Sequence, residues 1–190
     1  MKTSQKHKLI MVGGISANGK STLAKSLHGH FNAASQKTML IDSDLVRKVI
    51  WYSEKGESRF DETITLPTDA YSTEFSQKTY DKMAQLATYA LNRGMNVIVD
   101  ATFLSEEERA RFQALAEKYQ AEPHGFWLEN DQAVLEHRAD EREKGVSDAN
   151  SFVVGLQFKK EFGDVSQWTR IRTDKTAEVT FTKALSALKR

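Results

Sequence analysis

The chain has 190 residues, of which 39% are hydrophobic, and its formal net charge at pH 7 is +1. This length fits one domain with a full-sized core and leaves little room for a second. The near-neutral charge disfavours binding to long nucleic acids or anionic lipid, although a nucleic-acid end could be bound locally. The absence of cysteine excludes disulfides, Cys-ligated zinc, iron–sulfur clusters and a thiol nucleophile. No run of about 20 apolar residues occurs, so we expect a soluble, cytoplasmic protein without a membrane partner.

Short aliphatic runs alternate with longer amphipathic stretches, a pattern typical of an α/β fold in which helices cover a parallel sheet. In chain order, the predicted elements are a strand at 9–12, a helix at 20–31, a strand at 38–41, helices at 44–51 and 72–92, a strand at 96–99, a helix at 105–119, a strand at 124–128, helices at 131–144 and 147–162, a weak strand at 169–172 and a helix at 181–188. Nothing divides the chain, so residues 1–190 are interpreted as a single domain.

Local signals mark several of these boundaries. Asp44 can cap the helix that follows the second strand, and Ser105 with Glu108 three residues later has the spacing of a capping box. Gly94 is placed to end the long helix before the third strand. Residues 52–70 lack clear periodicity, which indicates a mobile or irregular insert of the kind that often faces substrate.

The strongest motif lies between the first predicted strand and helix. Residues 14–21, Gly-Ile-Ser-Ala-Asn-Gly-Lys-Ser, match the phosphate-loop pattern GxxxxGK[ST] in full. Gly14 and Gly19 allow backbone conformations and a close approach that a Cβ would obstruct, so successive N–H groups can face a phosphate. The N-terminus of the helix adds positive partial charge. The alternative is a glycine-rich turn with a chance lysine, which the strand–loop–helix context disfavours.

This motif predicts ATP and Mg²⁺ as cofactors. Lys20 is expected to contact the β- and γ-phosphates, and the Ser21 hydroxyl is placed to ligate Mg²⁺. The predicted nucleotide-binding residues are Gly14, Ser16, Ala17, Asn18, Gly19, Lys20, Ser21 and Thr22. The histidines lack metal-ligand spacing, so we expect the metal ion to arrive with the nucleotide.

Aspartates end the second and third predicted strands, where an open α/β sheet binds its ligands. Asp100 follows a hydrophobic strand and is predicted to enter the Mg²⁺ shell; a turn or helix-capping carboxylate is the alternative. Ala101 follows it, whereas motor ATPases usually place a glutamate there. Asp44 is the candidate general base and Arg47, three residues later, could hold the acceptor. Alternatively, Asp44 only caps its helix and pairs with Arg47.

Arg138 and Arg142 lie four residues apart and so share one face of a predicted helix. Planar guanidinium groups suit the charge that spreads over the equatorial oxygens during phosphoryl transfer, so both are candidate catalytic residues in a lid at about 136–150. Neighbouring carboxylates leave a solvated salt-bridge face as the alternative.

Taken together, the chain resembles the small P-loop kinases of the polynucleotide kinase and zeta-toxin type. It is most similar to the zeta-like AAA-family ATPase/kinase domain, which also occurs fused to aminoglycoside-phosphotransferase-like domains. The matching motifs are residues 14–22, 41–47, 97–103, 135–142 and 146–149, within about residues 8–175.

The resemblance implies a three-layer P-loop fold with a five-stranded parallel sheet in the order 2-3-1-4-5 and a helical lid. It implies that Asp44 is the general base, that Arg47 contacts the acceptor, and that Arg138 and Arg142 act from the lid. Polynucleotide kinases tend to have Asp-Thr-Asn where this chain has Asp-Ala-Thr at 100–102, and their insert differs. These departures concern the acceptor side of the site.

The sequence therefore predicts an ATP-dependent kinase for a hydroxyl group of a small molecule, a nucleotide or a nucleic-acid end. A nucleotide-dependent switch or toxin-like binding module with slow hydrolysis is the first alternative. A plain NTPase is the second, and Ala101 argues against it. The sequence does not indicate the acceptor or the oligomeric state.

Overall fold

A five-stranded parallel sheet forms the centre of the computed structural model, which describes residues 6–56, 60–141 and 148–189. The elements are β1 (Lys8–Gly13), α1 (Lys20–Ala33), β2 (Thr38–Asp42), α2 (Ser43–Lys55), the 3₁₀ helix η1 (Thr68–Tyr71), α3 (Thr73–Leu91), β3 (Asn96–Asp100), α4 (Glu106–Lys118), β4 (Glu122–Glu129), α5 (Gln132–Glu141), α6 (Ser151–Phe158), β5 (Thr169–Arg172) and α7 (Ala177–Ala187). The strand order is β2-β3-β1-β4-β5, as the resemblance implied.

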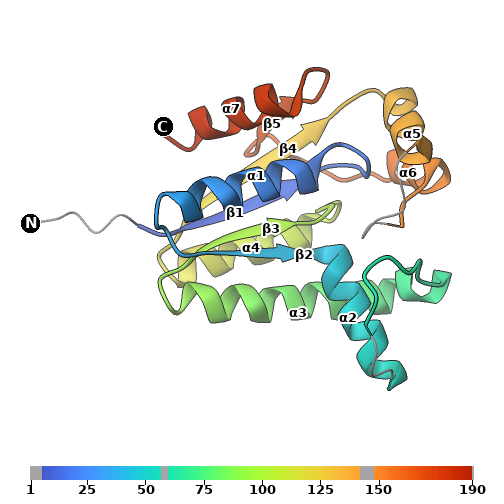
Figure 1. The fold of residues 1–190 in the computed structure, drawn as a ribbon, viewed down its shortest axis with the longest axis horizontal. Helices are drawn as coiled ribbons and strands as arrows, with labels where there is room; N and C mark the ends of the chain where they lie inside the picture. Colours follow the sequence, from blue (N-terminus) through green and yellow to red (C-terminus); the bar gives the residue numbers. More distant parts are fainter. Residues whose placement is uncertain (1–5, 57–59, 142–147, 190) are drawn as a thin grey trace, which may run out of the picture.

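Helices cover both faces of the sheet, which gives the expected three layers (Figure 1). On one face α1 and α7 pack over a core that includes Ile10, Leu27 and Ile98; on the other, α3 and α4 pack over a core that includes Met83 and Phe112. Successive side chains of a strand point to opposite faces, so strands buried on both sides are continuously apolar, as 97–99 are. The three-layer expectation is confirmed.

The parallel register brings the carboxyl ends of the strands to one edge of the sheet. Val12 pairs with Asp100, and Asp42 pairs with Asp100 from the other side, so two of the strand-end aspartates are direct neighbours. The loop after β1, the start of α2, and the helices α5 and α6 all gather at this edge (Figure 1). The topology therefore places every predicted motif that the structure describes around one end of the sheet.

Four predicted helix boundaries were wrong. α2 continues through residues 52–55, which were assigned to the irregular insert, and ends at Gly56 in the left-handed conformation (φ 67°). α6 begins at Ser151 instead of 147, because the Asn150 side chain accepts a hydrogen bond from Val153 N and caps it. It also ends at Phe158, before 162. α7 begins four residues earlier than predicted, behind a Thr176 cap.

Other boundaries were confirmed. Ser105 caps α4 as predicted, since its hydroxyl accepts from Glu107 N, and the Glu108 side chain bonds the Ser105 backbone as in one half of a capping box. α3 ends just before Gly94, which has a φ of 67°. The end of the predicted helix at 131–144 lies outside the described residues. Among the residues that are described, no helix combines the length and apolar character needed to span a membrane.

Candidate active site

The phosphate loop at 14–21 is braced by the carboxyl ends of neighbouring strands. Gly14 N donates to Thr102 O at 3.0 Å, and Asn18 Nδ2 donates to Leu128 O at 2.6 Å. The Thr173 hydroxyl donates to Asn18 Oδ1 at 2.5 Å. Gly14 has a φ of 125°, and a Cβ there would lie 2.3 Å from Leu128 O, so the loop can approach β4 only with glycine at this position.

A glutamine that the sequence analysis missed holds the same loop from α6. Gln157 Oε1 accepts from Ser16 N at 2.8 Å, and its Nε2 donates to Ser16 Oγ at 3.0 Å. The N–H groups of Gly14 and Ser16 are thus used within the protein. We therefore expect the phosphates to be met by amides further along the loop, from Ala17 to Ser21.

The loop opens onto a chamber of about 280 Å³ at the carboxyl edge of the sheet. Its walls combine a lysine, three aspartates and an arginine from five separate elements, a charge pattern that suits a metal-bound polyphosphate. The lining residues are Ser16, Ala17, Asn18, Gly19, Lys20, Ser21, Thr22, Asp42, Ser43, Asp44, Asp100, Thr102 and Arg138. The structure thus brings together most of the predicted site residues. Lys20 Nζ donates to Ile15 O at 3.0 Å.

Asp100 lies at the bottom of this chamber, 4% exposed. Burial raises its pKa to about 7; nearby Asp42 and Asp44 add to this, while Lys20 and a hydrogen bond with the Ser21 hydroxyl oppose it. The two predicted metal ligands, Asp100 and Ser21, are therefore in contact. Hard oxygen donors and excess negative charge fit Mg²⁺. Among the described residues, no group of three or more His, Cys, Asp or Glu side chains is arranged to hold a metal ion.

We expect D100N to stabilise the nucleotide-free protein at alkaline pH. The folded pKa of Asp100, about 7, is higher than the value of about 3.9 in an unfolded chain, so ionisation of Asp100 weakens the fold as pH rises through this interval. Asparagine removes this effect. The free energy of unfolding of the variant should exceed that of the wild type by about 2–4 kcal/mol at pH 8 and match it near pH 4. Urea unfolding without Mg²⁺ measures both.

The matched control is D81N. The pKa of Asp81 is lowered, mainly by its hydrogen bond with Arg111, so this exposed carboxylate should stabilise the fold at neutral pH. Its replacement should shift stability at pH 8 slightly in the opposite direction. A D100N protein less stable than the wild type at pH 8 would contradict the assignment of Asp100 as a strained, buried acid.

Asp42, and not Asp44, caps α2. Asp42 Oδ1 accepts from Asp44 N at 2.9 Å and from Leu45 N at 3.1 Å, and α2 begins at Ser43. The expectation that Asp44 is the cap was wrong, because β2 extends one residue further and delivers Asp42 to the N-cap position. Asp44 lies in the first turn of the helix with its carboxylate on the chamber wall. Helix capping therefore does not explain why an aspartate occupies position 44.

Arg47 packs behind the chamber wall. Its Nη1 donates to Ala70 O at 2.6 Å and to Ser76 Oγ at 3.4 Å, and its guanidinium lies 4.9 Å from the centroid of the Tyr71 ring. Its Nε is buried without a partner within the described part of the chain. Arg47 thus holds the end of the insert against α2, and its direct contact with an acceptor remains a prediction.

Arg138 reaches the phosphate loop from α5, whereas Arg142 lies outside the described residues. Arg138 lines both the chamber and a second cavity of about 210 Å³. Its Nη2 donates to Thr173 O at 3.0 Å. The second cavity also contacts Gly19, Thr22 and Lys175, and so continues from the phosphate loop toward α7. This geometry fits a nucleoside on the far side of the loop from Asp44.

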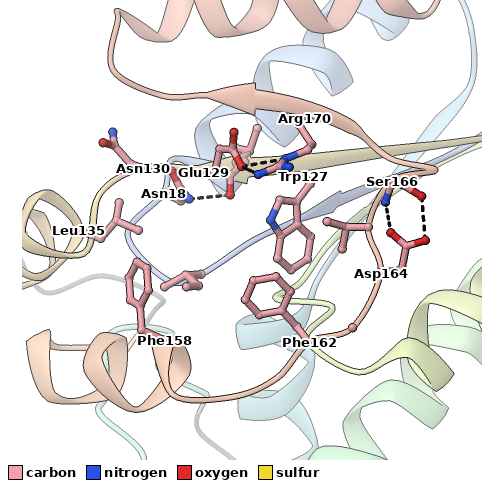
Figure 2. Close-up of a pocket in the computed structure, with 14 residues that line it drawn as sticks. Asn18, Trp127, Glu129, Asn130, Leu135, Phe158, Phe162, Asp164, Ser166 and Arg170 are labelled. Carbon is pink, nitrogen blue, oxygen red and sulfur yellow. Dashed lines mark hydrogen bonds and ion pairs between the residues drawn. The ribbon is translucent and has the colours of Figure 1, made fainter.

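A third cavity, of about 450 Å³, lies beneath the loop beside β4. Figure 2 shows Trp127, Leu135, Phe158 and Phe162 around it. Its charged lining residues are engaged within the protein, since the Arg170 guanidinium donates to the Glu129 carboxylate and Asp164 accepts from Ser166. Size alone therefore does not make this cavity the site of chemistry.

The fold and the chamber define a kinase-like P-loop nucleoside triphosphatase domain. A family described as AAA domain matches residues 9–161, so the chain belongs to this family. No curated protein sequence is significantly similar to the chain.

Solved structures of kinases share the fold at low identity. A gluconokinase from Sinorhizobium meliloti has a TM-score of 0.67 at 15% identity, over 98% of this chain and 94% of that one. An APS kinase from Mycobacterium tuberculosis, in complex with AMPPNP and APS, has a TM-score of 0.66 at 16% identity, over 97% and 99%. A sugar kinase from Janibacter has a TM-score of 0.64 at 16% identity, over 96% of this chain and 95% of that one.

Proposed function

We propose that the protein transfers the γ-phosphoryl group of ATP to a hydroxyl group of a small molecule or nucleotide-type acceptor. One observation carries this proposal: Lys20, Asp44 and Asp100 line the same chamber at the mouth of a braced phosphate loop. Similarity of fold to kinases that act on sugars or nucleotides supports it. We also propose that residues 1–190 form a single, cytoplasmic kinase domain of the polynucleotide kinase and zeta-toxin type.

In the proposed reaction, the Asp44 carboxylate accepts the proton of the acceptor hydroxyl as the oxygen attacks the γ-phosphorus. The bond between the γ-phosphorus and the bridging oxygen breaks, and ADP leaves with that oxygen. Lys20 and Arg138 offset the charge on the transferring group. Ser21 and Asp100 would hold Mg²⁺, which supplies charge neutralisation on the β- and γ-phosphates. Ala101 at the position after Asp100 leaves no carboxylate there to activate water.

The direct test incubates the protein with γ-labelled ATP, Mg²⁺ and candidate acceptors. Sugars, nucleosides, aminoglycosides and oligonucleotides with a 5′-hydroxyl end cover the acceptor classes. Label in one class, at a rate above hydrolysis, supports the proposal and names the acceptor. ATP binding without label in any class would contradict it and favour the nucleotide-dependent switch.

A further inference from the structure

A buried ion pair joins α2 to the residues just before α6 and has no part in the mechanism above. The side chains of Lys48 and Asp148 are 1% and 6% exposed, and Nζ lies 3.3 Å from Oδ1. Burying two charges costs desolvation free energy, which their attraction offsets well only when their other hydrogen-bonding atoms also find partners. The other bonds of this pair therefore indicate what it holds in place.

Those bonds all go to residues 62–71, which we call the acceptor-side segment. Lys48 Nζ donates to Glu62 O at 2.8 Å. Asp148 Oδ2 accepts from Leu66 N at 3.0 Å and from the Tyr71 hydroxyl. The contacts lie at the start, the middle and the end of the segment, so one ion pair fixes its whole length against α2.

The end of this segment lies beside the proposed general base. Burial and the bond with Asp148 raise the pKa of Tyr71, and the nearby charge of Asp44 adds to this. The neutral Tyr71 hydroxyl therefore remains a donor to Asp148 at neutral pH, and its ring supports Arg47. The Tyr71 ring therefore touches the helix that carries Asp44, since Arg47 lies three residues after it on α2.

The same short stretch of chain also contacts the phosphate loop. Asp148 lies two residues before Asn150, the cap of α6, and Gln157 near the end of α6 makes both bonds to Ser16. Residues 148–157 thus connect the loop that would bind phosphates with the segment beside Asp44. A short helix bonded near its end, at Gln157, and preceded by a bonded residue, Asp148, can carry coupling between two sites.

We infer that Asp148 is a positioning residue, and that α6 couples phosphate binding at Ser16 to the ordering of the acceptor-side segment. Phosphates in the loop would restrain Ser16 and Gln157, and α6 would then hold Asp148 more firmly against Leu66 and Tyr71. By thermodynamic reciprocity, a well-ordered segment also favours nucleotide binding. The acceptor kinetics predicted from this inference rest on the proposed function, whereas the coupling itself does not.

The test is hydrogen–deuterium exchange of the full chain, with and without AMP-PNP and Mg²⁺. In the wild type, the nucleotide should slow exchange in peptides covering 62–71 by about fivefold or more, as well as in those covering the phosphate loop. In D148N the slowing at 62–71 should be lost while that at the loop stays. Q157A breaks the other end of the connection and should also remove the slowing at 62–71; because Gln157 itself braces the loop, only the peptides covering 62–71 are compared in this variant. Y71F, which removes a single hydroxyl, should weaken the slowing even if D148N folds poorly.

The matched control is D164N. Asp164 also accepts from a backbone amide and a hydroxyl, those of Ser166 at 2.7 and 2.8 Å, but it does not contact the segment. D164N should show the same slowing of exchange at 62–71 as the wild type. Two results would overturn the inference. In the first, the nucleotide slows exchange at 62–71 equally in D148N and in the wild type. In the second, it protects the loop of the wild type but does not slow exchange at 62–71.

Once an acceptor is known, D148N should raise its KM about tenfold or more, with a smaller change in kcat and in the affinity for AMP-PNP. D148E, which retains the charge, should recover part of this loss. If no acceptor is ever labelled but exchange responds as expected, the proposed function fails and the coupling stands. If label is transferred but exchange at 62–71 does not depend on Asp148, the proposed function stands and the coupling fails.

Discussion

D44N should lower the rate of phosphoryl transfer by about 10²–10⁴-fold, which is the usual contribution of a positioned general base. Asparagine has nearly the same shape as aspartate but cannot accept the proton of the acceptor hydroxyl. The fold should be unaffected, because Asp42 caps α2 and Asp44 does not. Single-turnover transfer of label from γ-labelled ATP measures the rate, and calorimetry with AMP-PNP and Mg²⁺ should show nucleotide affinity changed by less than about threefold.

E54Q provides the comparison for this result. Glu54 is an exposed carboxylate on the same helix and pairs at the surface with Lys78. Its replacement should leave the transfer rate near that of the wild type. If D44N transfers phosphate as fast as E54Q, the base lies elsewhere. If neither variant nor the wild type transfers phosphate, and all three hydrolyse ATP at the same slow rate, the nucleotide-dependent switch becomes the better description.

K20A should lose about 10²-fold or more in affinity for ATP, since the lysine would make charge-assisted bonds to two phosphates, each contributing about 1.5–3 kcal/mol. Transfer should fall at least as far. The fold should tolerate the change, because Lys20 lines an open chamber. Titration with AMP-PNP and Mg²⁺ measures affinity, and thermal unfolding without nucleotide verifies the fold.

K25A is the control for Lys20. Lys25 is an exposed lysine on α1, five residues further along the chain and outside the chamber. Its loss should change affinity by less than about twofold. Unchanged affinity in K20A would remove the basis for a phosphate site at 14–21 and, with it, the proposed reaction.

The sequence could predict those parts of the site whose functional residues lie within a few consecutive positions. The phosphate loop is one, since the glycines, the lysine and the serine of 14–21 form a local pattern between a strand and a helix. Asp100 is another, because an apolar strand ending in a carboxylate needs only its own five residues to be recognised. The sheet order followed from the resemblance that these motifs support.

What sequence could not predict depends on contacts between distant residues. Gln157 lies 141 positions from Ser16, and nothing in the composition of α6 distinguishes it from a surface glutamine. Lys48 follows Arg47 on an amphipathic helix, where a lysine is usually exposed, yet it is 0% exposed because Asp148 lies against it, 100 residues away. Asp148 was part of a recognised motif without an assigned role.

The wrong N-cap predicted for α2 has a local cause of a different kind. Asp42 and Asp44 are both good caps, and pattern alone does not say which of them still belongs to the strand. Pairing of Asp42 with Asp100 in the sheet decides it. That choice matters for chemistry, since the carboxylate that caps the helix is occupied by two backbone amides.

The bracing of the phosphate loop has a consequence for how recognition begins. A loop whose shape is maintained by Thr102, Leu128 and Gln157 has already lost its conformational entropy when the protein folds, so ligand association need not order it. The triphosphate tail can then be captured as the first event of an encounter, before the base or the acceptor is in place. Discrimination between nucleotides and between acceptors would follow from slower adjustments around an anchor that is already set.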